Sequence, residues 1–273
     1  MRVAFLGQVG SNSEGAATEY FGADLVRVPC DSFEAIFAAV EQGRADRAML
    51  PIENALAGSI HSNYDLLLER DLHIVGELNF YVQHNLLALP GVALTDIVIV
   101  WSHPQALGQC AGYLTRLGVA REPTTDTTVA ARRVRDENRR DTAAIASLRA
   151  AESYGLVALA EGIEDSGENY TRFLILAREP IPPSTEGEWK TSLVFSLDNV
   201  PGSLYQALAV FALRGLNLSK IESRPLRRRR WEYFFYLDFT ASMADPTAQA
   251  ALAELGGMAP FLRVLGSYPR DLT

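Results

Sequence analysis

Hydrophobic and polar positions follow two different periods along the first two-thirds of the chain. Short apolar runs predict buried strands, and these lie at residues 3–6, 48–51, 97–101 and 143–146. Between them, apolar residues recur every three or four positions, which predicts amphipathic helices. D-x-x-E at Asp31 and S-x-x-Q at Ser102 have the spacing of helix caps, and Ser147 can cap a third helix. Strands that alternate with helices predict a largely parallel sheet covered by helices.

A second pattern begins after a break. Residues 178–188 are rich in proline and charge and have no apolar period, so they are predicted to form a linker. Beyond the linker, apolar and aromatic runs predict strands at residues 191–197, 216–222, 231–240 and 261–265. Predicted helices start at Pro201 and Pro246. This order of strand, helix, two strands, helix and strand is typical of a ferredoxin-like unit.

Composition and charge narrow the classes of function. Apolar residues make up 48% and charged residues 21% of the 273 residues, which is typical of a globular protein with two domains. The net charge of −8 argues against nucleic acid as a partner, and the basic run 227–230 is predicted to be a solvated hairpin loop. The sequence has no apolar run of membrane-spanning length and no recognisable signal peptide, and Cys30 and Cys110 lack disulfide or metal-site spacing. We therefore expect no membrane partner and a cytoplasmic location.

Residues 169–176 combine polar side chains with a strand-like apolar run. In a regular strand Asn169, Thr171 and Phe173 share one face, and Arg172 points to the other. A threonine hydroxyl next to an amide and an aromatic ring can donate a hydrogen bond inside a pocket that excludes water. Taken alone, the segment favours an ordinary strand entry.

Six segments together resemble the prephenate dehydratases that carry a C-terminal ACT regulatory domain. They are Leu6–Ala17, Pro51–Asn54, Ile74–Glu77, Ser102–Leu107, Asn169–Phe173 and Glu222–Pro225. The resemblance covers essentially the whole chain. It implies an α/β fold, with a two-lobed, periplasmic-binding-protein-like catalytic domain followed by a βαββαβ ferredoxin-like ACT domain. The implied parts are a catalytic domain at 1–178 (lobe one about 1–76 plus 154–178, lobe two about 77–153), a linker at 179–189 and the ACT domain at 190–273.

The family reaction removes CO2 and the ring hydroxyl of prephenate and gives phenylpyruvate and water. The resemblance therefore implies a carbon–oxygen lyase that needs no cofactor and no metal. It implies Thr171, Glu53 and Asn54 as catalytic residues, with the Thr171 hydroxyl donating to the leaving hydroxyl. The implied substrate-binding residues are Ser11, Ser13, Ser102, His103, Gln105, Asn169, Arg172 and Phe173.

Several of these assignments have alternatives. Glu53 is otherwise an exposed acid after a strand, and His103 is otherwise a neighbour of a helix cap. Arg172 either binds a substrate carboxylate or forms an ion pair behind its strand. The N–H groups of residues 7–14, a glycine-containing loop ahead of a helix, are expected to hold a carboxylate.

In the ACT domain the resemblance implies an allosteric site for L-phenylalanine, which would control phenylalanine biosynthesis by feedback. The implied effector residues are Asn199, Pro201, Gly202, Ser203, Leu204, Glu222, Ser223, Arg224 and Pro225. ACT domains commonly pair their sheets, so we expect a homodimer or homotetramer, with the effector acting on the catalytic cleft from a distance.

Two other functions stay open at this point. Residues 58–68 also resemble the plant branch of the family, which uses arogenate, the amine counterpart of the ketone prephenate. The other alternative is a binding module without chemistry, because two-lobed α/β domains and ACT domains often only bind small molecules.

Overall fold

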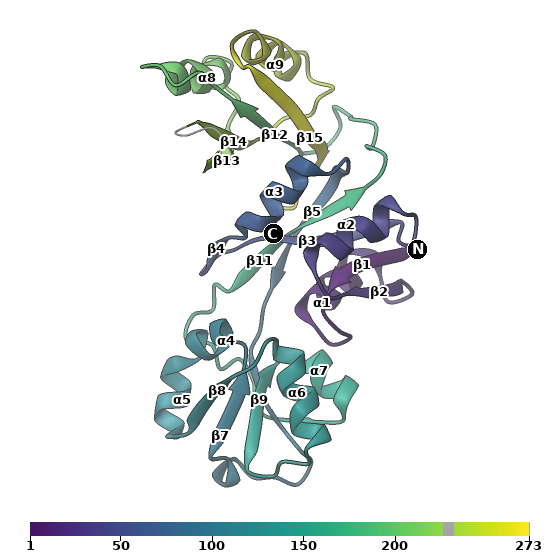
Figure 1. Ribbon diagram of the computed structural model, residues 1–273, viewed down its shortest axis with the longest axis vertical. Coiled ribbons are helices and arrows are strands. Elements are labelled where there is room, and N and C mark those ends of the chain that lie inside the picture. Colours follow the sequence, from purple (N-terminus) through teal and green to yellow (C-terminus); the bar gives the residue numbers. More distant parts are fainter. Residues whose placement is uncertain (226–231, 273) are drawn as a thin grey trace. The chain divides into compact units, whose positions relative to one another are not determined.

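Three β-sheets organise the residues that the computed structural model describes, 1–225 and 232–272 (Figure 1). The arginines at 227–230, predicted to form a hairpin loop, lie outside these residues. The chain divides into two compact units, Met1–Tyr64 with Leu78–Phe173, and Asp65–Glu77 with Leu174–Thr273. This division groups residues 65–77 with the C-terminal part, whereas the sequence prediction placed nearly all of them in lobe one.

The first sheet contains the N-terminal strands. Its strand order is β2-β1-β3-β11-β5, with β4 paired to β3, and β1 runs parallel to both β2 and β3. The strands are β1 (Arg2–Leu6), β2 (Val26–Cys30), β3 (Arg47–Asn54), β4 (Gly58–Ser59), β5 (His73–Tyr81) and β11 (Tyr170–Ala177). The helices of this region are α1 (Asn12–Phe21), α2 (Phe33–Glu41) and α3 (His61–Glu69). Helix α2 is capped by Ser32 and not by the predicted Asp31, because Ser32 is the last extended residue and its hydroxyl accepts from the Ala35 N–H.

The second sheet is mixed, so the prediction of largely parallel sheets is wrong here. Its order is β10-β6-β9-β7-β8; β7 is parallel to β8 and β9, whereas β6 is antiparallel to both β9 and β10. Strand β6 enters the second sheet directly after β5, which belongs to the first sheet. No helical crossover from a neighbouring strand therefore sets the direction of β6. The strands are β6 (Asn85–Ala88), β7 (Ile99–Ser102), β8 (Ala120–Pro123), β9 (Thr142–Ala146) and β10 (Val157–Ala160). The helices are the short 3₁₀ turn η1 (Leu94–Asp96), α4 (Pro104–Gln109), α5 (Ala111–Leu117), α6 (Thr127–Asp136) and α7 (Leu148–Tyr154).

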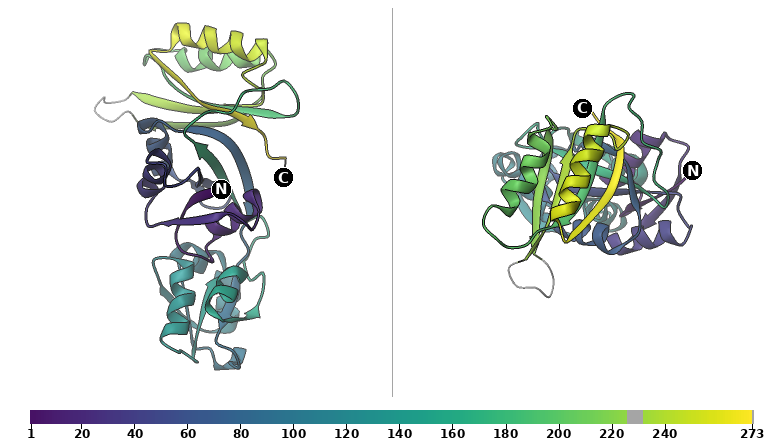
Figure 2. Two further views of the ribbon diagram at one scale, coloured as in Figure 1. Left: turned by 90° about the vertical axis from the view of Figure 1, so that its right-hand side faces the viewer. Right: turned by 90° about the horizontal axis from the view of Figure 1, so that it is seen from above.

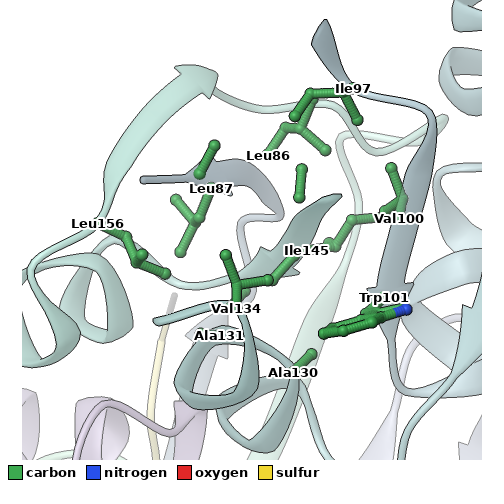
Figure 3. Close-up of a cluster of buried hydrophobic side chains, with 14 of the residues drawn as sticks. Leu86, Leu87, Ile97, Val100, Trp101, Ala130, Ala131, Val134, Ile145 and Leu156 are labelled. Atoms are coloured by element: carbon green, nitrogen blue, oxygen red, sulfur yellow. The ribbon is translucent and has the colours of Figure 1, made fainter. Parts of the chain in front are cut away.

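A continuous apolar core fixes the second sheet against α6 (Figure 3). The small side chains of Ala130 and Ala131 on α6 are fully buried, as are Val134 and, on β9, Ile145. Trp101 on β7 is buried too, and its indole N–H donates to Glu122 at 2.8 Å. Burial of this many apolar side chains makes the second sheet a stable platform for the loops at its ends.

The third sheet is the predicted ferredoxin-like unit, and its topology is confirmed. The strand order is β13-β14-β12-β15, and every neighbouring pair is antiparallel. The strands are β12 (Trp189–Ser196), β13 (Leu218–Pro225), β14 (Tyr233–Phe239) and β15 (Phe261–Pro269), and the helices are α8 (Ser203–Ala212) and α9 (Pro246–Met258). Figure 2 shows α8 and α9 side by side on one face of this sheet.

Polar contacts inside the second unit explain why it includes residues 65–77. The Lys190 ammonium lies 2.6 Å from the Glu77 carboxylate, and both side chains are almost completely buried. Breaking such a pair would leave an uncompensated charge in the interior, so the two strands that carry it are held together. The Arg263 guanidinium donates to the carbonyl oxygens of Leu68 and Arg70 at 3.2 and 2.9 Å.

Gly266 provides a test of this packing. A Cβ atom at Gly266 would lie 2.1 Å from the Ile74 carbonyl oxygen, a distance that requires the backbone to move. We expect Gly266→Ala to lower the free energy of unfolding by at least about 1–3 kcal/mol, measured by urea denaturation. Gly257→Ala is the matched control, because Gly257 lies in α9 with no atom within 4 Å of the added methyl group. Equal stability of the two variants would contradict this close approach.

Candidate active site

A cavity of about 270 Å³ lies within the first compact unit. Its wall is formed by the ends of β1 and β3, the start of β11, and the first turns of α1, α4 and α6. The lining residues are Leu6, Ser11, Asn12, Ser13, Pro51, Asn54, Val82, His84, His103, Gln105, Ala106, Gln109, Thr125, Asp126, Thr127, Asn169, Thr171 and Phe173. Eight of the eleven predicted catalytic or substrate-binding residues are thereby brought together: Ser11, Ser13, Asn54, His103, Gln105, Asn169, Thr171 and Phe173.

The Thr171 hydroxyl is oriented by the Asn54 side chain. The Asn54 amide nitrogen donates to Thr171 Oγ1 and to Asn169 Oδ1, both at 3.0 Å. The Asn54 amide oxygen accepts from the backbone N–H groups of Leu56 and Ala57 at 3.1 and 3.0 Å, which fixes which end of the amide faces Thr171. Thr171 Oγ1 is therefore an acceptor in this bond, and its own proton is left to donate to another group in the cavity.

A chain of uncharged groups continues from Asn54 to His84. Asn169 is fully buried, and its amide nitrogen donates to the Val82 carbonyl at 3.0 Å. Gln109 donates to Asn169 Oδ1 at 3.3 Å, and Gln109 Oε1 lies 2.7 Å from His84 Nε2. Because an amide oxygen only accepts, His84 Nε2 carries the proton of this bond. Burial lowers the pKa of His84 below its ordinary 6.5, so the ring is neutral at pH 7.

Helix N-termini supply the positive potential of the cavity. Ser11 caps α1 by accepting from the Glu14 N–H at 3.2 Å, and Asp126 caps α6 by accepting from the Thr128 N–H at 2.7 Å. The partial positive charge at the start of each helix favours anions. Among the described lining residues Asp126 is the only aspartate, glutamate, lysine or arginine. The cavity is therefore suited to hold carboxylates through N–H, amide and hydroxyl donors without a basic side chain in its wall.

Three predicted residues lie outside the cavity lining. Glu53 and Arg172 directly adjoin Asn54 and Thr171 in their strands, so alternation turns their side chains to the opposite face. Ser102 is fully buried, and its hydroxyl donates to the Ile145 carbonyl at 2.7 Å. The expectation that Ser102 caps the next helix is wrong.

His103 takes the capping position that was expected for Ser102. Helix α4 begins at Pro104, so the last extended residue before it is His103, one position later than predicted. The ring nitrogen Nδ1 of His103 accepts from the Gln105 N–H at 3.2 Å. His103 thus both caps a helix and lines the cavity, so its two predicted roles are compatible.

One N–H group of the glycine-containing loop at residues 7–14 is already used inside the protein. The Gly10 N–H donates to the carboxylate of Glu14 at 3.2 Å, so this donor already has an anionic partner in the protein. Gly10 has a φ of +90°, and a Cβ atom there would lie 2.9 Å from Ala150 Cα. The Ser147 hydroxyl donates to the Gly10 carbonyl at 2.6 Å. This glycine is thus required for close packing against the start of α7, and the residues that reach the cavity are Ser11 to Ser13.

The polar cavity residues that sequence reasoning missed include His84, Gln109 and Asp126. Gln109 was detectable, because it lies four residues after Gln105 and therefore on the same face of α4. The other two lacked such a signal, because His84 precedes a short strand and Asp126 has the appearance of an ordinary helix cap.

The predicted effector residues lie in the second unit, before α8 and at the end of β13. Gly202 caps α8 with a φ of +86°, and Leu204 packs against the apolar core of the third sheet. The Arg224 guanidinium makes a two-point contact with Asp65 on α3, at 2.9 and 3.3 Å. A cavity of about 440 Å³ in this unit is lined by the linker and the start of α9, and none of the effector residues contributes to it.

Within 1–225 and 232–272, no three histidine, cysteine, aspartate or glutamate side chains are grouped so that they could hold a metal ion. None of the helices in this part of the chain combines the length and the apolar character that crossing a bilayer requires.

Comparisons with known proteins cover the whole chain. The family model for prephenate dehydratase matches residues 3–181, and the ACT domain model matches residues 191–257. The chain is 54% identical to the chloroplastic arogenate dehydratase/prephenate dehydratase 2 of Arabidopsis thaliana, over 100% of this chain and 74% of that protein. A prephenate dehydratase from Arthrobacter aurescens, solved in complex with L-Phe, has a TM-score of 0.91 and 34% identity over 99% of this chain and 90% of its own. GqqA, described as a quorum quenching acylase, has the same TM-score of 0.91 and 37% identity, over 100% of this chain and 99% of its own.

The comparison corrects the predicted location. A relative with more than half of its aligned residues identical is a chloroplast protein, so the expectation of a cytoplasmic protein is wrong. Compositional features such as the two unpaired cysteines do not distinguish the cytoplasm from the inside of a plastid, and this is why the sequence argument failed.

The buried His84 predicts how stability depends on pH. Because burial lowers the pKa of His84 in the folded state, the unfolded chain binds the extra proton first as the pH falls below about 6.5. We expect the folded protein to lose up to about 1 kcal/mol between about pH 7.5 and pH 5.5 through this residue alone. The variant His84→Gln should lose less stability over this pH range than the unsubstituted protein. Urea denaturation of both proteins measures the difference. His61→Gln, at an exposed position, should retain the full loss, and an unchanged pH profile in His84→Gln would contradict the assignment.

Proposed function

The chain belongs to the prephenate dehydratase family, and from this premise we propose that it catalyses the decarboxylating dehydration of prephenate and of its amine counterpart arogenate. The observation that carries the proposal is the hydrogen bond from Asn54 to Thr171 Oγ1, because it leaves the hydroxyl proton available to the cavity. Prephenate would yield phenylpyruvate and arogenate would yield phenylalanine. Support for both substrates comes from the Arabidopsis relative, whose name includes both activities.

The reaction breaks two bonds and makes an aromatic ring. The bond between the ring and its carboxylate breaks, CO2 leaves, and the electron pair of that bond enters the ring. The ring C–O bond breaks at the other end, and the hydroxyl leaves as water with one added proton, which comes ultimately from solvent. Aromatisation provides the driving force, so the protein must mainly assist the departure of the hydroxyl and orient the substrate.

Thr171 is the donor that would meet the leaving hydroxyl. An alcohol is too weak an acid to give up its proton outright at neutral pH, but a fixed hydrogen bond can stabilise charge that develops on the departing oxygen. Phe173 is almost completely buried and forms part of the cavity wall, where it limits the access of water. The first turn of α1 would hold a carboxylate of the substrate.

Acyl hydrolysis, the activity named for GqqA, is less well supported by this site. A serine nucleophile needs a base within hydrogen-bonding reach. Ser11 instead bonds to Leu6 and Glu14, and His84 Nε2 donates to Gln109. Acyl hydrolysis would also leave the hydrogen bond from Asn54 to Thr171 without a function. Dehydration is therefore the function that we propose.

The decisive experiment measures product formation from prephenate in variants of Thr171. We expect Thr171→Val, which keeps the shape and loses the hydroxyl, to lower kcat by about 10²–10⁴-fold. Thr171→Ser keeps the hydroxyl and should retain part of the activity. Wild-type-like turnover in Thr171→Val would remove this residue from the mechanism.

A second arm of the same experiment tests the direction of the hydrogen bond. Asn54→Asp has nearly the same shape, but its carboxylate would accept from Thr171 and turn the hydroxyl proton away from the substrate. We expect it to be as inactive as Thr171→Val. Near-normal activity in Asn54→Asp would show that the orientation of the proton is unimportant.

For regulation, we propose that L-phenylalanine binds the ACT domain and inhibits the reaction, in a homodimer or homotetramer. The ACT match and the L-Phe complex of the Arthrobacter relative support an effector of this kind. The contacts of α3 suggest the route: Asp65 on this helix pairs with Arg224 of the effector segment, and Asn63 on the same helix donates to the Pro51 carbonyl at 2.6 Å. Pro51 lines the active-site cavity.

This route can be separated from effector binding. In Asp65→Asn we expect L-phenylalanine still to give heat in isothermal titration, while its effect on kcat/KM falls by roughly half or more, because the charged pair with Arg224 is lost. Asp71→Asn is the matched control, since this carboxylate is 97% exposed and lies near the same helix. Absence of any heat with the unsubstituted protein would refute the effector, and full inhibition in Asp65→Asn would refute the route.

A further inference from the structure

Prephenate and arogenate differ at one group, and that group changes the charge of the substrate. Both carry two carboxylates. Prephenate has a ketone in its side chain, and arogenate has an ammonium group at the same carbon. A pocket can therefore discriminate between them with a single charge placed near this carbon, since the remaining atoms of the two molecules are alike.

Asp126 is the residue in the cavity wall that can supply such a charge. Among the described lining residues it alone carries a formal charge at pH 7 from an acidic or strongly basic side chain. Its oxygen Oδ1 accepts from the N–H and the hydroxyl of Thr128, which fixes the carboxylate at the start of α6. Its oxygen Oδ2 accepts no hydrogen bond from the part of the chain that the structure describes. The carboxylate is half-buried, so its field is less screened by water than that of a surface acid.

The composition of the cavity wall increases the influence of the Asp126 charge on a ligand. The other polar groups of the described wall are hydroxyl, amide and imidazole groups, such as those of Thr127, Gln105 and His103. No lysine or arginine among the described lining residues neutralises it. A ketone gains nothing from a carboxylate at this place and its carbonyl oxygen is repelled, whereas an ammonium group forms a charge-assisted hydrogen bond with it.

We infer that Asp126 is a specificity-determining residue that favours the substrate with an ammonium group over the substrate with a ketone, through Oδ2. The inference rests on the proposed dehydratase function. It assigns the side chain of the substrate to the α6 side of the cavity, and it leaves the reacting hydroxyl to Thr171. Asp126 thus acts on the choice of substrate and takes no part in bond breaking.

The experiment compares kcat/KM for arogenate and prephenate in the full chain and in Asp126→Asn. Asparagine is as good a helix cap as aspartate, so α6 should stay intact, and the thermal midpoint checks this. We expect the ratio of kcat/KM for arogenate to that for prephenate to fall by roughly tenfold or more, the effect of one close charge in a partly solvated site. The change should appear mainly in KM, because the ammonium group lies away from the bonds that break.

Asp245→Asn is the matched control. Asp245 caps α9 in the same way, accepting from the Thr247 N–H at 2.7 Å, and it lies in the other compact unit. This variant should leave the ratio unchanged. If Asp126→Asn is poorly folded, Asp126→Ser provides a second neutral cap for the same comparison.

The outcomes separate this inference from the proposed function. If the unsubstituted protein converts neither substrate, the dehydratase function fails and the inference fails with it. If it converts at least one, and the ratio in the folded Asp126 variants stays within about twofold of the original, only the inference is overturned. An equal fall in kcat/KM for arogenate and for prephenate would also overturn the inference, because that result indicates a general structural role for Asp126.

Discussion

The polarity of one hydrogen bond decides which group of the candidate site can donate a proton into the cavity. Asn54 presents its amide nitrogen to Thr171, so the threonine oxygen accepts and its proton is directed elsewhere. That orientation is enforced by the turn after β3, whose N–H groups at Leu56 and Ala57 hold the amide oxygen. A local turn of the backbone thus fixes the direction of a proton in the cavity, and the geometry is in place without any rearrangement of the site.

The described wall of the cavity contains helix N-termini, amide groups and hydroxyl groups, and no lysine or arginine. Helix N-termini and amide groups have smaller charges than arginine, but they are fixed by the fold and lose no side-chain freedom when a ligand binds. A neutral wall also keeps the local dielectric low when the cavity is filled, which strengthens a single hydrogen bond such as that from Thr171. In such surroundings the one carboxylate, Asp126, has more influence on the choice of ligand than it would have among other charges.

Much of the fold followed from the sequence, and the active site followed in part. Alternation in β11 placed Asn169, Thr171 and Phe173 on one face, and the cavity contains all three. The apolar periods of the ACT domain predicted its strands and helices in their order along the chain, since each of these elements follows from a local pattern. The direction of β6 was not predictable in this way, because it depends on how the chain passes between sheets. Asp126 was missed because a helix cap has the same sequence signature whether it faces a cavity or solvent.

Residues 51–65 contribute to the cavity wall, to the turn that orients the Asn54 amide and to the contact with Arg224. Pro51 and Asn54 line the cavity, the pairing of Asn54 with Gly58 closes the turn that orients the amide, and Asn63 ties α3 back to Pro51. Two residues further along the helix, Asp65 pairs with Arg224. In the proposed route, a displacement at Asp65 would pass along α3 to Asn63 and from there to the strand that carries Asn54. The same short segment would then orient the Thr171 hydroxyl and respond to the effector.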